Sequence, residues 1–207
     1  MSGASELAEQ LRAVAGDERV LAAIASLPRE HFVPDRERHR AYENVALPIA
    51  CEQTISQPLV IARMLALLEL RPDDRVLDVG TGSGYHAALL AMLAGHVWTV
   101  ERHPRLSAQA QRTIAALGLS NVEFVVGDGC RGLPARAPFD AINVAAATGE
   151  ALPPALERQL AAQGRLVAPV GTADQHLVLV RRTAEGFERK QLEAVRFVPL
   201  VRAEPET

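Results

Sequence analysis

A short apolar segment that runs directly into three closely spaced glycines constrains the fold of this chain most. Residues 76–85 read Val-Leu-Asp-Val-Gly-Thr-Gly-Ser-Gly-Tyr. Glycine turns without a Cβ clash and helix starts offer free amides, so the pattern predicts a strand, a tight turn and a helix that approach a ligand closely. A second apolar stretch, Val97–Val100, ends at Glu101, about twenty residues after the first glycine. Because a carboxylate can accept hydrogen bonds from both hydroxyls of a ribose, the two features indicate a cofactor that contains adenosine.

The spacing of the glycines indicates which adenosine cofactor to expect. A dinucleotide fingerprint reads Gly-x-Gly-x-x-Gly and holds a pyrophosphate at the helix start. In this chain Gly80, Gly82 and Gly84 form the shorter pattern Gly-x-Gly-x-Gly. The spacing therefore favours S-adenosylmethionine over NAD. A glycine-rich turn alone also occurs in ordinary strand-to-helix connections, so the argument depends on the strand before it and the acid after it.

Short apolar strands alternate with helices along most of the chain. The expected strands are residues 75–79, 97–100, 122–126, 141–145, 166–170, 176–181, 187–192 and 195–200, and the expected helices are residues 58–70, 85–93, 106–117 and 152–160. Near-continuous apolar strands must bury both of their faces, which is typical of a parallel sheet covered by helices on both sides. The sequence therefore predicts an α/β fold with a mostly parallel, doubly wound sheet.

The length of 207 residues suits one domain, because about 100–200 residues per domain is usual. We expect a single domain with three segments. Residues 1–57 form an N-terminal helical cap and a substrate loop, with Asp17 capping its second helix. Residues 58–172 form the cofactor-binding α/β core, and residues 173–207 form C-terminal strands.

Composition and motifs exclude several classes of partner. The formal net charge of −3 gives no electrostatic reason to expect nucleic acid. The N-terminus lacks a basic segment followed by an apolar one, and no apolar run approaches the ~20 residues that span a bilayer, so we expect a cytoplasmic protein without membrane contact. Cys51 and Cys130 are the only cysteines, and the six histidines are scattered without ligand spacing, so we expect no metal site.

Asp128 and Gly129 follow the strand expected at residues 122–126. The carboxylate can accept a hydrogen bond from the amine of an adenine, although an ordinary Asp-Gly turn also explains the pair. Carboxyl ends of parallel strands meet at one edge of a sheet. We therefore expect Gly80–Gly84, Glu101, Asp128 and Ala145–Thr148 to converge on one crevice.

The segment Gln53–Pro58 allows two interpretations. Thr54 or Ser56 can cap the helix that begins at Pro58, since hydroxyl caps and a proline in the first turn are both common. Alternatively, a loop beside the cofactor crevice places the Ser56 hydroxyl near the reacting groups. The residues alone give the two interpretations about equal weight.

These motifs together resemble the protein-L-isoaspartate (D-aspartate) O-methyltransferase family. The resemblance extends over about residues 18–201. The glycine-rich turn is shared by many methyltransferases, whereas the Thr-Ile-Ser-Gln-Pro block and the Arg-Phe-Val-Pro-Leu tail are specific to this family. The segments that carry the resemblance are residues 46–49, 53–58, 77–85, 97–102, 127–129, 137–142 and 195–200.

The resemblance implies a Rossmann-like methyltransferase fold and a reaction. The expected reaction is methyl transfer from S-adenosylmethionine to the α-carboxylate of L-isoaspartyl residues in damaged proteins and peptides, with D-aspartyl residues left open as acceptors. The methyl ester then relaxes through a succinimide, and the enzyme is expected to be a monomer. By resemblance Ser56 is the catalytic residue. The cofactor-binding residues implied are Gly80, Thr81, Gly82, Ser83, Glu101, Arg102, Asp128 and Gly129, and the substrate-binding residues implied are Ile49, Ala50, Thr54, Ile55 and Val201.

The chain departs from the usual pattern of this family at the loop before Gln53. Ala50 and Cys51 stand where glycine-containing residues are frequent, and a Cβ at Ala50 can alter how the loop closes over substrate. Three alternatives stay open. They are a carboxylate methyltransferase dedicated to one peptide or small molecule, a cofactor-binding protein without catalysis, and, remotely, an NAD-dependent oxidoreductase.

Overall fold

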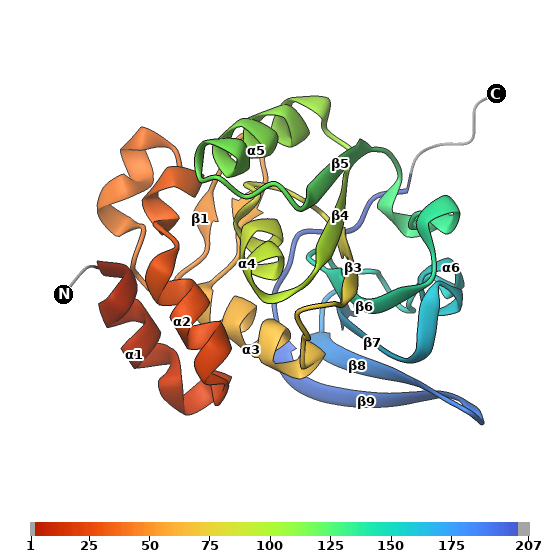
Figure 1. Cartoon of the computed structure of the whole chain (residues 1–207). Helices are drawn as coiled ribbons and strands as arrows, with labels where there is room; N and C mark the ends of the chain where they lie inside the picture. The colour runs from red at the N-terminus through yellow and green to blue at the C-terminus, as the bar shows by residue number, and fades with distance from the viewer. Residues whose placement is uncertain (1–2, 203–207) are drawn as a thin grey trace.

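The computed structural model describes residues 3–202, and a seven-stranded sheet runs through its centre in the order β5-β4-β3-β6-β7-β8-β9 (Figure 1). Strands β3 to β7 are parallel, and β8 and β9 are antiparallel to their neighbours. The prediction of an α/β fold with a mostly parallel sheet is confirmed. The strands are β3 (Arg75–Val79), β4 (His96–Glu101), β5 (Val122–Val126), β6 (Phe139–Val144), β7 (Leu160–Val170), β8 (Gln175–Thr183) and β9 (Gly186–Val195).

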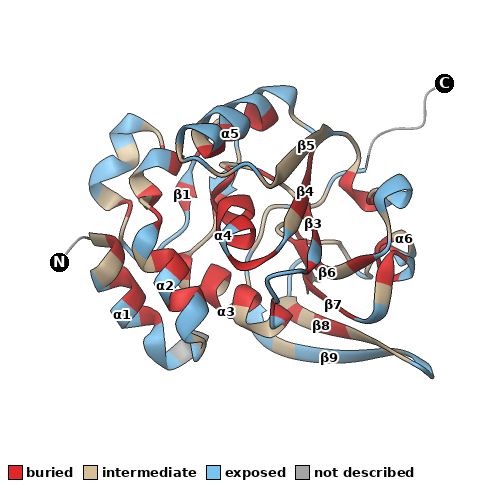
Figure 2. Cartoon of the chain, in the orientation of Figure 1, coloured by how far each residue is buried: buried red, intermediate tan, exposed pale blue. Residues whose placement is uncertain are grey.

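Helices of very different length cover the two faces of the sheet. On one face lie α3 (Pro58–Leu68), α4 (Tyr85–Leu93) and α5 (Pro104–Ala116), and near the other lie η3 (Gly129–Arg131), η4 (Pro134–Arg136) and α6 (Pro154–Arg158) (Figure 1). Nearly every side chain of α4 is buried, because the sheet packs on one side of it and the N-terminal segment on the other (Figure 2). The helix that follows the glycine-rich turn is therefore held rigidly.

The N-terminal segment packs onto the core as helices and one small hairpin. Its elements are α1 (Gly3–Ala15), α2 (Glu18–Ser26), η1 (Arg29–Phe32), η2 (Asp35–Arg40), β1 (Leu47–Pro48) and β2 (Thr54–Ile55). As predicted, the Asp17 carboxylate caps α2 by accepting hydrogen bonds from the amides of Arg19 and Val20. Apolar side chains of α1 and α2 belong to the same buried cluster as those of α3 and α4. The hairpin is thereby fixed beside the carboxyl edge of the sheet.

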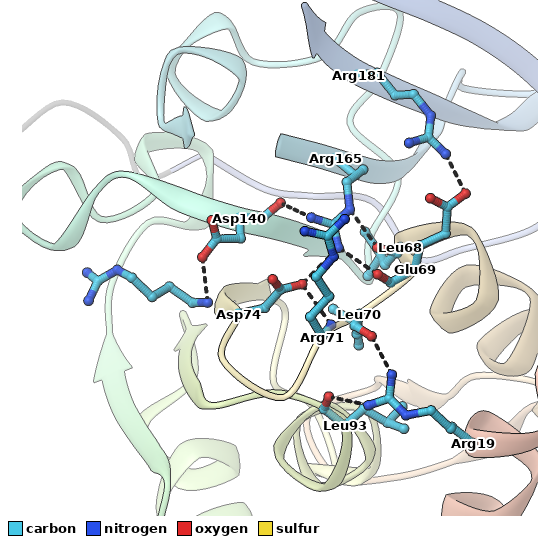
Figure 3. A network of polar contacts seen from close by, with 11 residues as sticks. Arg19, Leu68, Glu69, Leu70, Arg71, Asp74, Leu93, Asp140, Arg165 and Arg181 are labelled. Atoms are coloured by element: carbon cyan, nitrogen blue, oxygen red, sulfur yellow. Dashed lines mark hydrogen bonds and ion pairs between the residues drawn. The ribbon is translucent and has the colours of Figure 1, made fainter. Parts of the chain in front are cut away.

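A buried ion pair ties the end of α3 to the sheet (Figure 3). Arg165 on β7 is only 8% exposed and pairs with Asp74 at 2.8 Å. Its guanidinium also donates to the carbonyls of Leu68 and Glu69 at 2.8 and 2.7 Å. This cation has a counter-ion and several acceptors, as buried charges require.

Two expectations about secondary structure are wrong. Residues 195–200 do not form a third C-terminal strand, because only one bridge joins Pro199 to Ala147 and proline has no amide to extend a ladder. The helix expected at residues 152–160 spans only Pro154–Arg158, and Leu160 already begins β7. Pro153 and Pro154 place the start of the short helix two residues later than expected, and the start of β7 at Leu160 ends it early.

The turn of the small hairpin holds two non-glycine residues in a left-handed conformation. Cys51 and Glu52 have φ of 56° and 57°, while the Ile49 amide donates to the Gln53 carbonyl at 2.8 Å. Two successive residues of positive φ define the type I′ turn that suits hairpins and favours glycine. The backbone strain therefore falls on Cys51 and Glu52, whereas Ala50, the position singled out from the sequence, is not among the residues of positive φ.

Glu52→Gly is expected to raise the free energy of unfolding by about 0.5–1 kcal/mol, since a side chain in this conformation costs roughly 1 kcal/mol. Urea denaturation measures the change. Glu52→Ala is the control, because alanine removes the charge and keeps the Cβ, and it should give no stabilisation. An equal gain in both variants would assign the effect to the carboxylate instead of the backbone.

Candidate functional site

A cavity lies at the carboxyl edge of the parallel strands, and we name it the edge cavity. It is bounded by the ends of β3, β4 and β6, by η3 and by the C-terminal segment. Its walls therefore come from parts of the chain that are far apart in sequence. The lining residues are Gln53, Thr54, Val79, Gly80, Gly82, Val100, Glu101, Arg102, His103, Gly129, Ala145, Ala146 and residues 198–201.

Glu101 places a buried carboxylate in the wall of the edge cavity. Its side chain is 6% exposed, and its two oxygens accept hydrogen bonds from the amides of Gly82 at 2.9 Å and His103 at 3.0 Å. Each carboxylate oxygen has two lone pairs, so one lone pair on each stays free for a hydroxyl. Apolar walls from Val79 and Val100 flank this acceptor. The chemistry of this wall, a carboxylate acceptor between apolar side chains, matches a vicinal diol attached to a flat apolar base, as in adenosine.

The glycine-rich turn needs glycine for two different reasons. Gly80 and Gly82 have φ of 95° and 52°, which allows the chain to turn between β3 and α4. Gly84 has a packing role as well, since a Cβ there would lie 2.8 Å from the Cβ of Ala110 on α5. The first two glycines line the edge cavity, while the third lets α4 and α5 approach each other.

A buried polar network supports the turn. The hydroxyls of Thr81 and Thr99 are 2.6 Å apart, and the Thr99 hydroxyl donates to Asp78 at 2.8 Å. Asn143 on β6 donates to the other Asp78 oxygen at 2.7 Å. Burial raises the pKa of Asp78 to about 6, although the hydrogen bonds from Asn143 and Thr99 act against this rise. The Thr81 hydroxyl thus supports the turn, while Thr81 also lines a small cavity beside it, and its predicted role in binding the cofactor stays a prediction.

Asp78 is expected to make stability depend on pH between about 4 and 6. In this window the folded carboxyl binds more protons than the unfolded one, whose pKa lies near 3.9, so the free energy of unfolding falls as the pH rises and levels off above about 6. Urea denaturation from pH 4 to 7 of the wild type and Asp78→Asn isolates the effect. The difference in the free energy of unfolding between the two proteins should change with pH only in this window, by several kilocalories per mole at most. A difference that stays constant from pH 4 to 7 would contradict the prediction.

Asp128 and Gly129 contribute differently at the end of β5. Gly129 lines the edge cavity, and a Cβ at this position would lie 2.5 Å from Val79. The Asp128 carboxylate accepts a hydrogen bond from the Cys130 amide at 2.8 Å, which caps η3. It also lies 3.8 Å from the guanidinium of Arg131. The local Asp-Gly turn is therefore present, and it places Asp128 next to the cavity wall.

A larger cavity of about 760 Å³, which we name the main cleft, opens between the hairpin and the C-terminal segment. A small cavity of about 30 Å³, lined among others by Ser56, Ser83 and His86, lies between the main cleft and the glycine-rich turn. Thr54 and Ala145 line both of these cavities and the edge cavity. The main cleft is lined by residues 44–46, 54, 56–57, 60, 145 and 194–198.

Ser56 lines both the main cleft and the small cavity. The interpretation that Ser56 or Thr54 caps α3 is wrong, because Gln57 occupies the N-cap without a side-chain bond and the Leu59 amide donates to Asn44 at 3.0 Å. Within residues 3–202 the Ser56 hydroxyl has no hydrogen bond. It is therefore available to a ligand at the point where the cleft comes closest to the turn.

The remaining predicted site residues do not all gather in one place. Ile55 lines the small cavity, and Val201 and Arg102 line the edge cavity. Ile49 and Ala50 instead border a separate cavity of about 380 Å³ on the side of Arg36 and Arg105, which Ser83 also lines. The Ser83 hydroxyl accepts a hydrogen bond from the Tyr85 amide at 3.3 Å.

Several lining residues were not singled out from the sequence. They are His103, Pro199 and Leu200, which border the edge cavity. Ala145 and Ala146, which also border it, belong to the segment 145–148 that was expected at the crevice. His103 carries no motif, and it reaches the cavity only because the chain turns sharply after Glu101.

Comparison with known proteins agrees with this arrangement. The family model described as protein-L-isoaspartate(D-aspartate) O-methyltransferase matches residues 2–205. The chain belongs to this family. A family member from Sodalis glossinidius (strain morsitans), named protein-L-isoaspartate O-methyltransferase, is 52% identical over 188 residues, which cover 91% of this chain and 90% of that protein.

Solved structures of the same family share the fold. One protein-L-isoaspartate O-methyltransferase is 28% identical with a TM-score of 0.85, and the match covers 94% of this chain and 64% of that longer one. A Plasmodium falciparum structure, described as a candidate member in complex with S-adenosyl-L-homocysteine, has a TM-score of 0.85 at 24% identity, over 98% of this chain and 100% of its own. The second likeness concerns the fold alone.

Membrane-spanning helices and clusters of metal ligands are both absent from residues 3–202. None of the described helices is both long and apolar enough to cross a membrane. No group of three or more histidine, cysteine, aspartate or glutamate side chains in this range is placed to hold a metal ion.

Proposed function

We propose that this protein transfers a methyl group from S-adenosylmethionine to the α-carboxylate of L-isoaspartyl residues in damaged proteins and peptides. One observation carries the proposal. The Ser56 hydroxyl, without a partner among the described residues, lies between the main cleft and the glycine-rich turn that Glu101 supports. Family membership supports the same reaction.

The edge cavity is proposed to hold the cofactor, which supplies an electrophilic methyl group on its sulfonium when bound. Glu101 accepts hydrogen bonds from the ribose hydroxyls through its free lone pairs. Asp128 and Gly129 are assigned to the adenine, whose apolar faces suit Val79 and Leu200. Gly80, Gly82 and Arg102 complete the walls. The buried carboxylate and the apolar lining together support this assignment.

The acceptor needs positioning more than activation. A carboxylate is already ionised at neutral pH, so the protein requires no strong base. We assign to Ser56 a hydrogen bond to one carboxylate oxygen, which leaves the other oxygen free to react. Thr54 and Ala145 line the passage between cleft and edge cavity and restrict water there. Correct alignment of reacting groups contributes up to roughly 7–11 kcal/mol in favourable cases.

The size of the main cleft suits a peptide. Residues 194–198 form one wall and residues 44–46 another, so an extended chain can lie between them. The abnormal backbone is the feature to be recognised, and the ester cyclises to a succinimide without the enzyme, so we propose broad acceptance of peptide sequences. We further propose a cytoplasmic monomer without nucleic-acid or membrane partners, in line with the net charge of −3.

Radiolabelled S-adenosylmethionine tests the function with matched isoaspartyl and aspartyl peptides of several sequences. The proposal requires base-labile label on the isoaspartyl peptides only. Label on a single peptide regardless of linkage would favour a dedicated carboxylate methyltransferase. Binding of S-adenosylhomocysteine without any transfer would favour a non-catalytic protein. A D-aspartyl peptide in the same assay shows whether D-aspartyl residues are also methylated.

A further inference from the structure

Arg29 is a fully buried cation directly behind Ser56. It lies on η1 with 0% exposure, and its Nε donates to the Ala41 carbonyl at 2.9 Å. Its Nη2 donates to the Ser56 carbonyl at 3.1 Å, and its guanidinium lies over the Tyr85 ring, 5.0 Å from the centroid. Its Nη1 has no hydrogen-bond partner in the part of the chain that the structure describes.

The charge of Arg29 has no counter-ion among residues 3–202, in contrast to Arg165, which pairs with Asp74 at 2.8 Å (Figure 3). Burial lowers the pKa of Arg29 to about 10, so the side chain is still a cation at neutral pH. The groups beside it are phenols, which stay neutral because burial raises the pKa of both Tyr42 and Tyr85. Glu30 is the carboxylate next to these phenols, and it accepts a hydrogen bond from the Tyr42 hydroxyl but forms no ion pair with Arg29. Within residues 3–202 the guanidinium therefore has no direct counter-ion.

This charge lies close to the place where the proposed function puts the acceptor carboxylate. Ser56 lines the main cleft and the small cavity, and Tyr85 lines the small cavity as well. One hydrogen bond of 3.1 Å joins the guanidinium to the main chain of Ser56, a residue that lines the cleft. Charges inside a protein are screened far less than charges on its surface, so the cation favours an anion at this point of the cleft.

We propose that Arg29 is a positioning residue that makes the cleft select a negatively charged acceptor. It holds the main chain of Ser56, and its charge, which no ion pair in residues 3–202 neutralises, stabilises the carboxylate beside the hydroxyl. This inference rests on the proposed function. It adds that the enzyme distinguishes an isoaspartyl residue from the neutral isoasparaginyl residue, which has the same shape and a carboxamide in place of the carboxylate.

The experiment compares the affinities of an isoaspartyl and an isoasparaginyl peptide of one sequence, with saturating S-adenosylhomocysteine. The wild type should prefer the charged peptide. In Arg29→Gln this preference should fall by at least about tenfold, equivalent to ~1.4 kcal/mol. The affinities for the neutral peptide and for S-adenosylhomocysteine should stay within about threefold.

Arg19→Gln is the matched control. Arg19 also donates to two main-chain carbonyls, those of Leu70 at 2.6 Å and Leu93 at 3.0 Å, but neither borders the main cleft (Figure 3). This variant should keep the wild-type preference. An unchanged preference in Arg29→Gln, or an equal loss in Arg19→Gln, would overturn the inference.

A second variant covers the case in which Arg29→Gln does not fold. Arg29→Lys keeps the charge while a single ammonium replaces the fork that reaches both Ala41 and Ser56. The inference then requires Arg29→Lys to keep the wild-type preference for the charged peptide within about threefold. Loss of this preference would count against the inference. The proposed function is judged separately, because it fails only if the wild type does not methylate the isoaspartyl peptide.

Discussion

Ser56→Ala is expected to lower kcat for isoaspartyl peptides by about 10²-fold and to leave the affinity for S-adenosylmethionine nearly unchanged. A hydrogen bond to a charged group is worth about 1.5–3 kcal/mol, and the acceptor also loses its alignment when this bond is removed. The cofactor is spared because the Ser56 side chain lines the main cleft and the small cavity but not the edge cavity. Steady-state kinetics and calorimetry measure the two quantities.

Two further variants make the result for Ser56 interpretable. Ser56→Thr keeps a hydroxyl and should recover a large part of kcat. Ser26→Ala removes a hydroxyl from the exposed end of α2, where it donates to the Ala22 carbonyl at 2.7 Å, and should behave like the wild type. Equal losses of kcat and cofactor affinity would assign Ser56 to support of the fold, and an unchanged rate would remove it from the mechanism.

Features determined by neighbouring residues were predictable from the sequence. Asp17 lies next to the helix it caps, and the conformation of Gly80 and Gly82 follows from a turn between an apolar strand and a helix. The strand containing Val97 had to end at Glu101, which brings the carboxylate to the same edge of the sheet. Local pattern and the rule for parallel strands therefore predicted the edge cavity.

Features that depend on distant segments were not predictable. Asn44 takes the capping role that one of the two interpretations gave to Ser56 or Thr54, and it does so across the loop that contains the hairpin. The burial of Arg29 without an ion pair follows from the packing of η1 beside Tyr85, which its sequence neighbours do not reveal. Residue type alone does not distinguish Arg29 from Arg165, because the difference is the presence of one carboxylate contributed by another part of the chain.

The backbone strain at residues 51 and 52 is another feature that the sequence alone did not locate. The sequence drew attention to Ala50 because the family often has glycine-containing residues there, but the turn type decides which positions need glycine. In this hairpin they are Cys51 and Glu52. Ala50 borders a different cavity from the one that Ser56 lines, and its role in binding substrate stays a prediction.

Glu101→Ala is expected to weaken S-adenosylmethionine binding by about 10²–10³-fold. Its carboxylate is the only charged acceptor assigned to the ribose, and hydrogen bonds to a charged group are worth about 1.5–3 kcal/mol each. The substitution also leaves the amides of Gly82 and His103 without their acceptor, which loosens the turn itself. Calorimetry measures the affinity directly.

The kinetic pattern of Glu101→Ala should be the reverse of the pattern of Ser56→Ala. At saturating cofactor kcat should recover to within about tenfold of the wild type, because the acceptor still meets Ser56 in the main cleft, and uniform binding energy affects affinity more than turnover. Glu188→Ala, on the exposed face of β9, removes the same side chain without effect on either quantity. Wild-type affinity in Glu101→Ala, or a kcat that does not recover at any cofactor concentration, would place the ribose elsewhere. The two substitutions therefore distinguish by function two cavities that adjoin at Thr54 and Ala145, because Glu101 lines only the edge cavity and Ser56 does not line it.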